Sequence, residues 1–75
     1  MKTTEAGRIE FGRQVVEYAH RANLFARFDV VAFLPKETES LGWNGQKELA
    51  EDWLDVLVGA GVLEKHGHDY QRAKP

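Results

Sequence analysis

The chain has 75 residues, of which 43% are hydrophobic and 29% charged, and its formal net charge is −2. A chain of this length forms one domain with a small core, because only about 60% of its unfolded surface is buried on folding, and its composition is that of a folded domain. It contains no cysteine, which excludes disulfides and thiol chemistry and leaves a reducing cytosol as the default compartment.

The longest apolar run, Val30 to Leu34, is too short to cross a bilayer, and no signal peptide is visible. We therefore predict a cytoplasmic protein that does not enter membranes. A slightly acidic chain also lacks the excess of positive charge expected of a protein that binds a phosphate backbone, unless a local basic patch supplies it.

The first predicted helix runs from Glu5 to about Asn23, with Thr4 as its cap. Its apolar side chains recur at helical spacing and comprise Phe11, Val15, Tyr18, Ala22 and Phe25, with Ile9, Val16 and Ala19 widening the stripe. Gly12 disfavours the helix, but it would allow another helix to approach closely. We expect residues 1–4 and 73–75 to be disordered ends of the single domain 1–75.

A broken segment follows, in which Asn23 and Leu24 mark a bend. Asp29 is placed to begin a short helix over Val30–Leu34, and Pro35 ends it because the residue before a proline avoids helical geometry. A polar turn of helix is then predicted over Lys36–Leu41, and a turn over Gly42–Asn44 leads into a longer helix. Two helices joined by a short turn that contains glycine are typical of a helix-turn-helix.

The longer helix is predicted to start at Asn44, whose side chain suits an N-cap. Its apolar residues Leu49, Trp53, Val56, Leu57 and Ala60 share one face. Gly61 can adopt the left-handed conformation that closes a helix. Two short strands, Val62–Lys65 and Asp69–Arg72, then form a hairpin with Gly67 at its tip. The predicted fold is mainly α, a winged helix-turn-helix with a small two-stranded β-hairpin wing.

Apolar side chains cover an arc of roughly 200° on the longer helix, well beyond the ~100° that a surface helix needs. Leu54 and Val58 lie at one edge of this arc. We expect them to contact a partner chain, together with Phe11, Val15 and Tyr18 of the first helix. The alternative, in which the first helix wraps around and covers them, stays open.

Charge on the same helix argues against insertion into DNA. Lys47 is its only cation, whereas Glu48, Glu51, Asp52 and Asp55 are acidic, so the segment has a net charge of −3. The helix therefore has almost no arginine or lysine side chains with which to contact guanine and phosphate. If the domain did bind DNA, Lys47, Lys65 and Arg72 are the residues that we would expect to touch phosphates.

No pattern in the sequence favours catalysis by this chain alone. His66, His68 and Asp69 include metal-binding residue types, but their spacing falls on a turn, where polar residues are expected anyway. The carboxylates Glu37 and Glu39 lack an apolar pocket that would raise a pKa. No nucleophile elbow, phosphate-binding loop or dinucleotide fingerprint is present, so we predict no catalytic residue and no metal site.

Three stretches, LFARFDVVAFLP, ESLGWN and EDWLDVLVGAGVLEKHGHDYQ, resemble the N-terminal winged-helix domain of class I S-adenosylmethionine-dependent small-molecule methyltransferases. The similar region covers about Val15 to Gln71. Asn44-Gly45 and the very short helix before Trp43 depart mildly from the family pattern.

This resemblance implies a non-catalytic dimerisation and protein-interaction module that helps to roof a substrate pocket. In that family the cofactor binds a separate Rossmann-like domain, and nothing here matches its glycine-rich loop, so no cofactor is expected in this chain. The implied partner is a second copy, or a methyltransferase domain or subunit. A small DNA-binding winged-helix regulator is the alternative.

Overall fold

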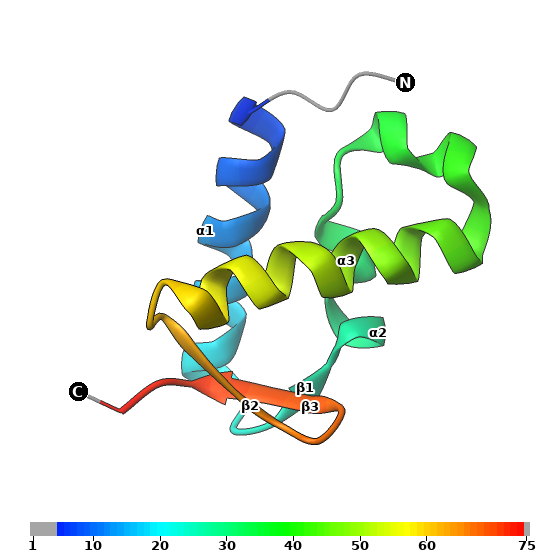
Figure 1. Cartoon of the computed structure of the whole chain (residues 1–75). Coiled ribbons are helices and arrows are strands. Elements are labelled where there is room, and N and C mark those ends of the chain that lie inside the picture. Colours follow the sequence, from blue (N-terminus) through cyan, green and yellow to red (C-terminus); the bar gives the residue numbers. More distant parts are fainter. Residues whose placement is uncertain (1–4, 75) are drawn as a thin grey trace.

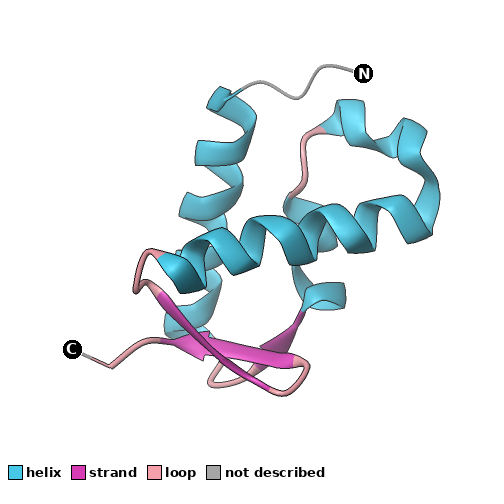
Figure 2. Ribbon diagram, viewed as in Figure 1, coloured by secondary structure: helices cyan, strands magenta, loops and turns pink. Residues whose placement is uncertain are grey.

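A computed structural model describes residues 5–74 (Figures 1 and 2). The chain is mainly helical and carries a small three-stranded antiparallel sheet. In chain order the elements are α1 (Glu5–Arg21), β1 (Phe25–Ala26), α2 (Arg27–Val30), the 3-10 helices η1 (Val31–Phe33) and η2 (Lys36–Leu41), α3 (Gly42–Gly59), β2 (Leu63–His66) and β3 (Asp69–Arg72). α3 crosses α1, and the sheet lies near the C-terminal ends of both long helices (Figure 1).

The first predicted helix is confirmed as α1, although it ends at Arg21 and not at Asn23. Phe11, Val15 and Ala19 are its buried residues. Their spacing of four places them on one stripe that faces the core. Thr4, the predicted cap, lies outside the described residues.

Between the long helices, the chain changes direction through short helical pieces. The Ala26 N–H donates a hydrogen bond of 2.9 Å to Asp29 Oδ2, which ties down the start of α2, so the helix begins earlier than the predicted Val30. Leu34 is extended, with φ −66° and ψ 149°, as expected before a proline. The turn of helix predicted over Lys36–Leu41 is confirmed as η2.

The predicted turn over Gly42–Asn44 is wrong, since these residues already form the first turn of α3. Gly42 makes the change of direction within one residue by adopting φ 75°, which is readily accessible only to glycine. Asn44 is therefore inside the helix and is not its N-cap, a position that Leu41 occupies without a side-chain hydrogen bond.

The C-terminus of α3 closes as predicted. Gly61 has φ 81°, its N–H donates to the Val58 carbonyl, and the Val62 N–H donates to the Leu57 carbonyl, both at 3.0 Å. These two bonds form a Schellman motif. They turn the chain directly from α3 into the hairpin.

The predicted hairpin is also confirmed, with β2 beginning one residue later than expected and Gly67 at the tip with φ 66°. The sheet nevertheless has three strands, in the order β1-β3-β2, because Phe25 in β1 pairs with Tyr70 in β3. A strand of two residues is too short to show the alternation from which strands are predicted.

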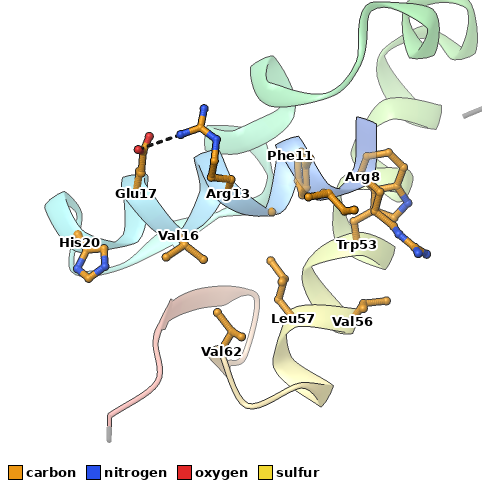
Figure 3. A pocket seen from close by; sticks show the side chains of 12 residues that line it. Arg8, Phe11, Arg13, Val16, Glu17, His20, Trp53, Val56, Leu57 and Val62 are labelled. Atoms are coloured by element: carbon orange, nitrogen blue, oxygen red, sulfur yellow. Dashed lines mark hydrogen bonds and ion pairs between the residues drawn. The ribbon is translucent and has the colours of Figure 1, made fainter. Parts of the chain in front are cut away.

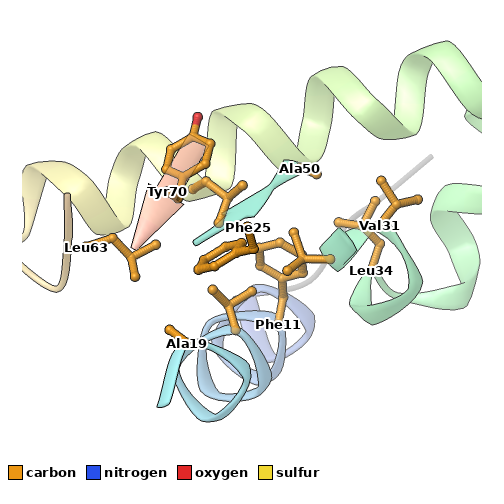
Figure 4. Close-up of a cluster of buried hydrophobic side chains, with 11 residues drawn as sticks. Phe11, Ala19, Phe25, Val31, Leu34, Ala50, Leu63 and Tyr70 are labelled. Carbon is orange, nitrogen blue, oxygen red and sulfur yellow. The ribbon is translucent and has the colours of Figure 1, made fainter. Parts of the chain in front are cut away.

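The core lies between the two long helices and the sheet (Figure 4). Its buried side chains come from every helix and strand except η2, and they are Phe11, Val15, Ala19, Phe25, Val30, Val31, Leu34, Ala50, Leu54, Leu63 and Tyr70. Thr38 of η2 is also fully buried, and its hydroxyl donates to the Pro35 carbonyl at 2.6 Å and accepts from Gln46 Nε2 at 3.2 Å. Every polar group of this side chain is thus satisfied.

Residues 1–4 and 75, which belong to the ends predicted to be disordered, lie outside the described residues, whereas Ala73 and Lys74 are held beside β2. The Ala73 N–H donates to the Val62 carbonyl at 3.0 Å, and the Lys74 N–H reaches Glu64 Oε2 at 3.4 Å. Across residues 5–74, no helix combines the length and the apolar character that a membrane span requires.

Candidate functional site

An open, mostly apolar groove of about 640 Å³ runs between α1 and the C-terminal half of α3 (Figure 3). Its lining comes from α1, from α3 and from the residue that precedes β2, and comprises Arg8, Ile9, Phe11, Gly12, Arg13, Val16, Glu17, His20, Trp53, Val56, Leu57 and Val62. Its volume falls within the range of roughly 300–1,000 Å³ that is usual for ligand pockets. The α1–α3 groove is larger than the hollow between the end of α1 and β3, of about 350 Å³, and than the hollow beside Phe28 and Trp43, of about 360 Å³.

The floor of the α1–α3 groove is built by aromatic and aliphatic packing. The ring of Phe11 meets that of Trp53 edge to face, with centroids 5.2 Å apart and planes at 73°. Val16, Leu57 and Val62 point toward one another (Figure 3). A methyl group added at Gly12 would lie 3.7 Å from Leu57 Cδ2, an ordinary contact distance, so the packing of α1 on α3 does not require a glycine at this position.

Two large aliphatic side chains that line the groove, one on each helix, are exposed. Ile9 of α1 is 64% exposed and Val56 of α3 is 57% exposed. A single exposed aliphatic residue is ordinary on a protein surface, but a contiguous apolar surface with polar edges is typical of an interaction site. Ile9 and Val56 extend the apolar floor, and so they make the groove such a surface.

Charged side chains of α1 form one edge of the groove. Arg13 bonds two carboxylates on its own helix, with its Nε 3.1 Å from Glu10 Oε1 and its Nη1 3.0 Å from Glu17 Oε1. The hydrogen bond from Arg13 to Glu10, supported by one from Gln14, lowers the pKa of Glu10 to about 2. Within residues 5–74, Arg8 takes part in no ion pair.

Three of the five residues predicted to contact a partner are buried in this structure. Phe11, Val15 and Leu54 have 1%, 0% and 0% of their surface exposed, so a partner cannot reach Val15 or Leu54 and meets only the groove side of Phe11. The sheet and α2 pack on α3 from the Leu54 side. The alternative was that the first helix wraps around and covers Leu54 and Val58. In the structure Leu54 is buried in a core to which α1, α2 and the sheet all contribute, and Val58 is partly buried.

Tyr18 and Val58, the other two predicted contacts, are only partly buried and pack against the core. The Tyr18 ring meets Phe25 and Phe33 edge to face, at centroid distances of 5.5 and 5.9 Å. Neither Tyr18 nor Val58 lines the α1–α3 groove.

The exposed residues Ile9 and Val56 were not among the predicted contacts. Val56 lies at the other edge of the same apolar arc as Val58, and periodicity gives no reason to prefer one edge over the other. Ile9, Gly12 and Val16 follow the spacing i, i+3, i+7, which marks a second apolar stripe on α1. The sequence therefore contained both apolar patterns, but only the packing of the sheet decides which edges of them stay exposed to solvent.

The three cations considered for DNA binding do not form one surface. Lys47 lies near the start of α3, whereas Lys65 is paired with Asp55 at 3.4 Å, about 12 Å further along that helix at 1.5 Å per residue. Arg72 instead contacts the imidazole of His20 at the end of α1. Lys65 is neutralised by its carboxylate, which leaves it little charge to offer a phosphate.

The polar turn of the hairpin does not form a metal site with any of the described residues. His66 Nε2 lies 3.3 Å from Glu64 Oε1, and residues 5–74 contain no group of three or more His, Cys, Asp or Glu residues placed to hold a metal ion. Among the described residues, the arrangement best suited to binding is the α1–α3 groove.

No known protein family, curated protein or solved structure matches this chain. The functional interpretation therefore depends on the geometry of the chain itself.

Proposed function

We propose that the chain is a non-catalytic interaction module that pairs with a second copy of itself through the α1–α3 groove. The observation that carries this proposal is the exposure of Ile9 and Val56 in the lining of an apolar groove. Fully burying an aliphatic side chain contributes about 1.5–3 kcal/mol. In a two-fold dimer each copy would bury its own Ile9 and Val56, so four aliphatic side chains would be removed from solvent.

The surface of the chain is large enough for such a contact. The total accessible surface is 4882 Å², and a standard interface buries about 800 Å² on each partner. That is roughly a sixth of this surface.

The residues of α1 that line the groove are self-complementary in an antiparallel pairing. If two copies of α1 cross beside Gly12, Ile9 lies against the partner's Val16 and Arg8 lies against the partner's Glu17. Arg8 would gain a carboxylate that it lacks within residues 5–74. The absence of a side chain at Gly12 lets the helices approach most closely near the two-fold axis, and the pairing is isologous as a two-fold dimer requires.

The order of elements supports a module of winged-helix type. A short helix (η2), a sharp turn at Gly42, the long helix α3 and a β-hairpin follow one another, which is the order in a helix-turn-helix with a wing. The resemblance to the N-terminal domain of small-molecule methyltransferases supports the same proposal. On that basis the alternative partner is a methyltransferase domain or subunit, and the cofactor would bind there.

Binding to duplex DNA is the weaker proposal. α3 would have to enter the major groove, yet it carries four carboxylates and one lysine between Lys47 and Asp55. Gel shifts at low and high salt distinguish the two proposals, since DNA binding would appear at low salt and weaken as salt rises.

Sedimentation equilibrium at micromolar concentrations tests the dimer. We expect a monomer–dimer equilibrium in the native chain, and dissociation when Ile9→Glu or Val56→Glu places a charge in the groove. Leu24→Glu is the matched control, since Leu24 is 51% exposed and does not line the groove.

The charges on α1 provide a sharper test of the antiparallel register. Arg8→Glu should weaken the dimer, and combining it with Glu17→Arg should restore much of the loss, because the pair is exchanged across the axis. A native chain that stays monomeric at all concentrations and captures no methyltransferase subunit would refute the proposed function.

A further inference from the structure

Two exposed aromatic rings lie together beside the N-terminal half of α3, whereas the α1–α3 groove adjoins its C-terminal half. Phe28 of α2 is 53% exposed and Trp43, in the first turn of α3, is 55% exposed. Their rings stack with centroids 6.3 Å apart and planes at 26°. Lys47 Nζ lies 5.4 Å from the Phe28 ring centre and 5.5 Å from that of Trp43. We call these three residues the aromatic patch.

The patch continues the core-facing stripe of α3 beyond the end of the core. Trp43, Lys47, Ala50 and Leu54 follow the spacing i, i+4, i+7, i+11 and thus share one side of the helix. Ala50 and Leu54 are fully buried. Trp43 lies on the same side, two turns earlier, where its ring stacks on Phe28 and remains 55% exposed.

A hollow of about 360 Å³ adjoins the aromatic patch. Phe28 and Trp43 form one side of it, and the buried side chains of Val31 and Leu34 contribute to its floor. The hollow has room for one large apolar side chain of a partner. Tryptophan in such a setting is strongly enriched among the residues that dominate binding energies.

Charges of both signs lie near the hollow. Glu39 lines it, whereas Lys47 does not line it but lies over the two aromatic rings that do. Lys47 takes part in no ion pair with the described residues, whereas the neighbouring Arg27 is already paired with Glu51 at 3.3 Å. Gln46 also lines the hollow. A carboxylate on an occupant would therefore be attracted to Lys47 and repelled by Glu39, which fixes its place next to the aromatic rings.

We propose that the aromatic patch is a second docking surface, and that its occupant is a segment of a partner protein presenting a large apolar side chain beside a carboxylate. The apolar side chain fills the hollow against Phe28 and Trp43, and the carboxylate pairs with Lys47. This surface shares no lining residue with the α1–α3 groove, so the module could hold a second copy and this partner together.

A single-stranded nucleic acid also binds aromatic rings and cations. It suits this surface less well, because a bound strand needs a positively charged groove that follows its backbone, whereas the patch offers one cation, Lys47, that is in no ion pair of the described residues. The peptide therefore remains the proposed occupant, and an oligonucleotide serves as a competing probe.

Chemical-shift titration of the native chain tests this proposal with three blocked peptides. SDEFLDS carries the anchor and the acids, SDEAADS lacks the anchor, and SKKFLKS reverses the charge. We expect SDEFLDS to shift the Trp43 indole N–H and the Lys47 amide with a dissociation constant of about 1 mM or below. The other two peptides should bind at least about fivefold more weakly.

Substitutions locate the binding. Trp43→Ala and Lys47→Gln should each weaken SDEFLDS about fivefold or more, while Val56→Ala, equally exposed but in the groove, should leave it unchanged. Circular dichroism would verify that each variant is folded. The proposal is overturned if SKKFLKS binds as well as SDEFLDS, if no peptide shifts these signals, or if an oligothymidylate of about eight nucleotides binds more tightly.

Discussion

The Tyr70 hydroxyl donates a hydrogen bond of 3.0 Å to Asp55 Oδ1, and thereby joins the central strand of the sheet to α3. Lys65 Nζ reaches the same oxygen at 3.4 Å and lies 5.5 Å from the centre of the Tyr70 ring. The ring itself is buried against Phe25, with centroids 6.1 Å apart. The Tyr70 ring thus belongs to the core, and its hydroxyl belongs to a polar contact with α3.

Removing that hydroxyl should cost stability without disturbing the core. We expect Tyr70→Phe to lower the free energy of unfolding by about 1 kcal/mol, since the ring keeps its packing and only the hydrogen bond to a charged acceptor is lost. Urea denaturation measures the change. Tyr18→Phe is the control, because the Tyr18 hydroxyl makes no hydrogen bond within residues 5–74, and an equal loss in both variants would contradict the assignment.

The same contact predicts how stability changes in alkali. Burial, and then the hydrogen bond to Asp55, raises the pKa of Tyr70 above its usual 10.0. A raised pKa in the folded state stabilises the fold fully below the unfolded value, and this contribution is lost as the pH rises through the folded value. The free energy of unfolding should therefore fall above about pH 10, and more steeply in the native chain than in Tyr70→Phe. Parallel pH profiles of the two proteins would show the prediction to be wrong.

Two glycines inside helices should respond in opposite ways to alanine. At Gly12 the new methyl group meets Leu57 Cδ2 at an ordinary 3.7 Å, so the gain in helix propensity should raise stability by about 0.5–1 kcal/mol. At Gly45 it would lie 2.8 Å from Leu41 Cβ, and the backbone of η2 must move, at a cost of about 1–3 kcal/mol. Thermal melts of the two variants measure the contrast, and a stabilised Gly45→Ala would show that this junction is not tightly packed.

The elements that follow from local rules were predictable from the sequence. Pro35 ends a helix because of its ring, Gly61 closes α3 because it tolerates a positive φ, and Gly67 turns the hairpin for the same reason. Each of these depends on one or two residues and their immediate neighbours, so no tertiary contact was needed to see it.

The features that were missed are tertiary. β1 exists only because Phe25 pairs with Tyr70, which is distant in the sequence. Leu54 and Val56 look alike in a periodic pattern, yet one is fully buried and the other 57% exposed, because the sheet packs on only one flank of α3. Asn44 was a suitable cap, but Gly42 starts the helix earlier. In the first two cases packing at long range selected among options that the local pattern allowed, whereas at Gly42 the backbone conformation of one residue did so.

The Arg13 cluster makes a prediction at acid pH. Because the hydrogen bond from Arg13 is the main cause of the low pKa of Glu10, about 2, Arg13→Ala should return that pKa toward the ordinary value near 4.3. Any stability that Glu10 contributes is present above its unfolded pKa and is lost as the pH falls through about 2. Carboxyl chemical shifts followed by NMR measure the pKa, with Glu48, which is exposed and in no ion pair of the described residues, as the control.

Leu54 and Val56 provide the clearest separation between folding and pairing. Leu54→Ala removes a side chain with no exposed surface, and we expect it to lower the free energy of unfolding by about 2–5 kcal/mol. Val56→Ala should change stability by no more than about 0.5 kcal/mol, because its side chain already faces solvent, while weakening the dimer proposed for the α1–α3 groove. Denaturation at low concentration, where the chain is monomeric, measures the first effect, and sedimentation measures the second. If Val56→Ala unfolded the monomer as strongly as Leu54→Ala, the exposed edge of the groove would have to be part of the core, and the surface proposed for pairing would not exist.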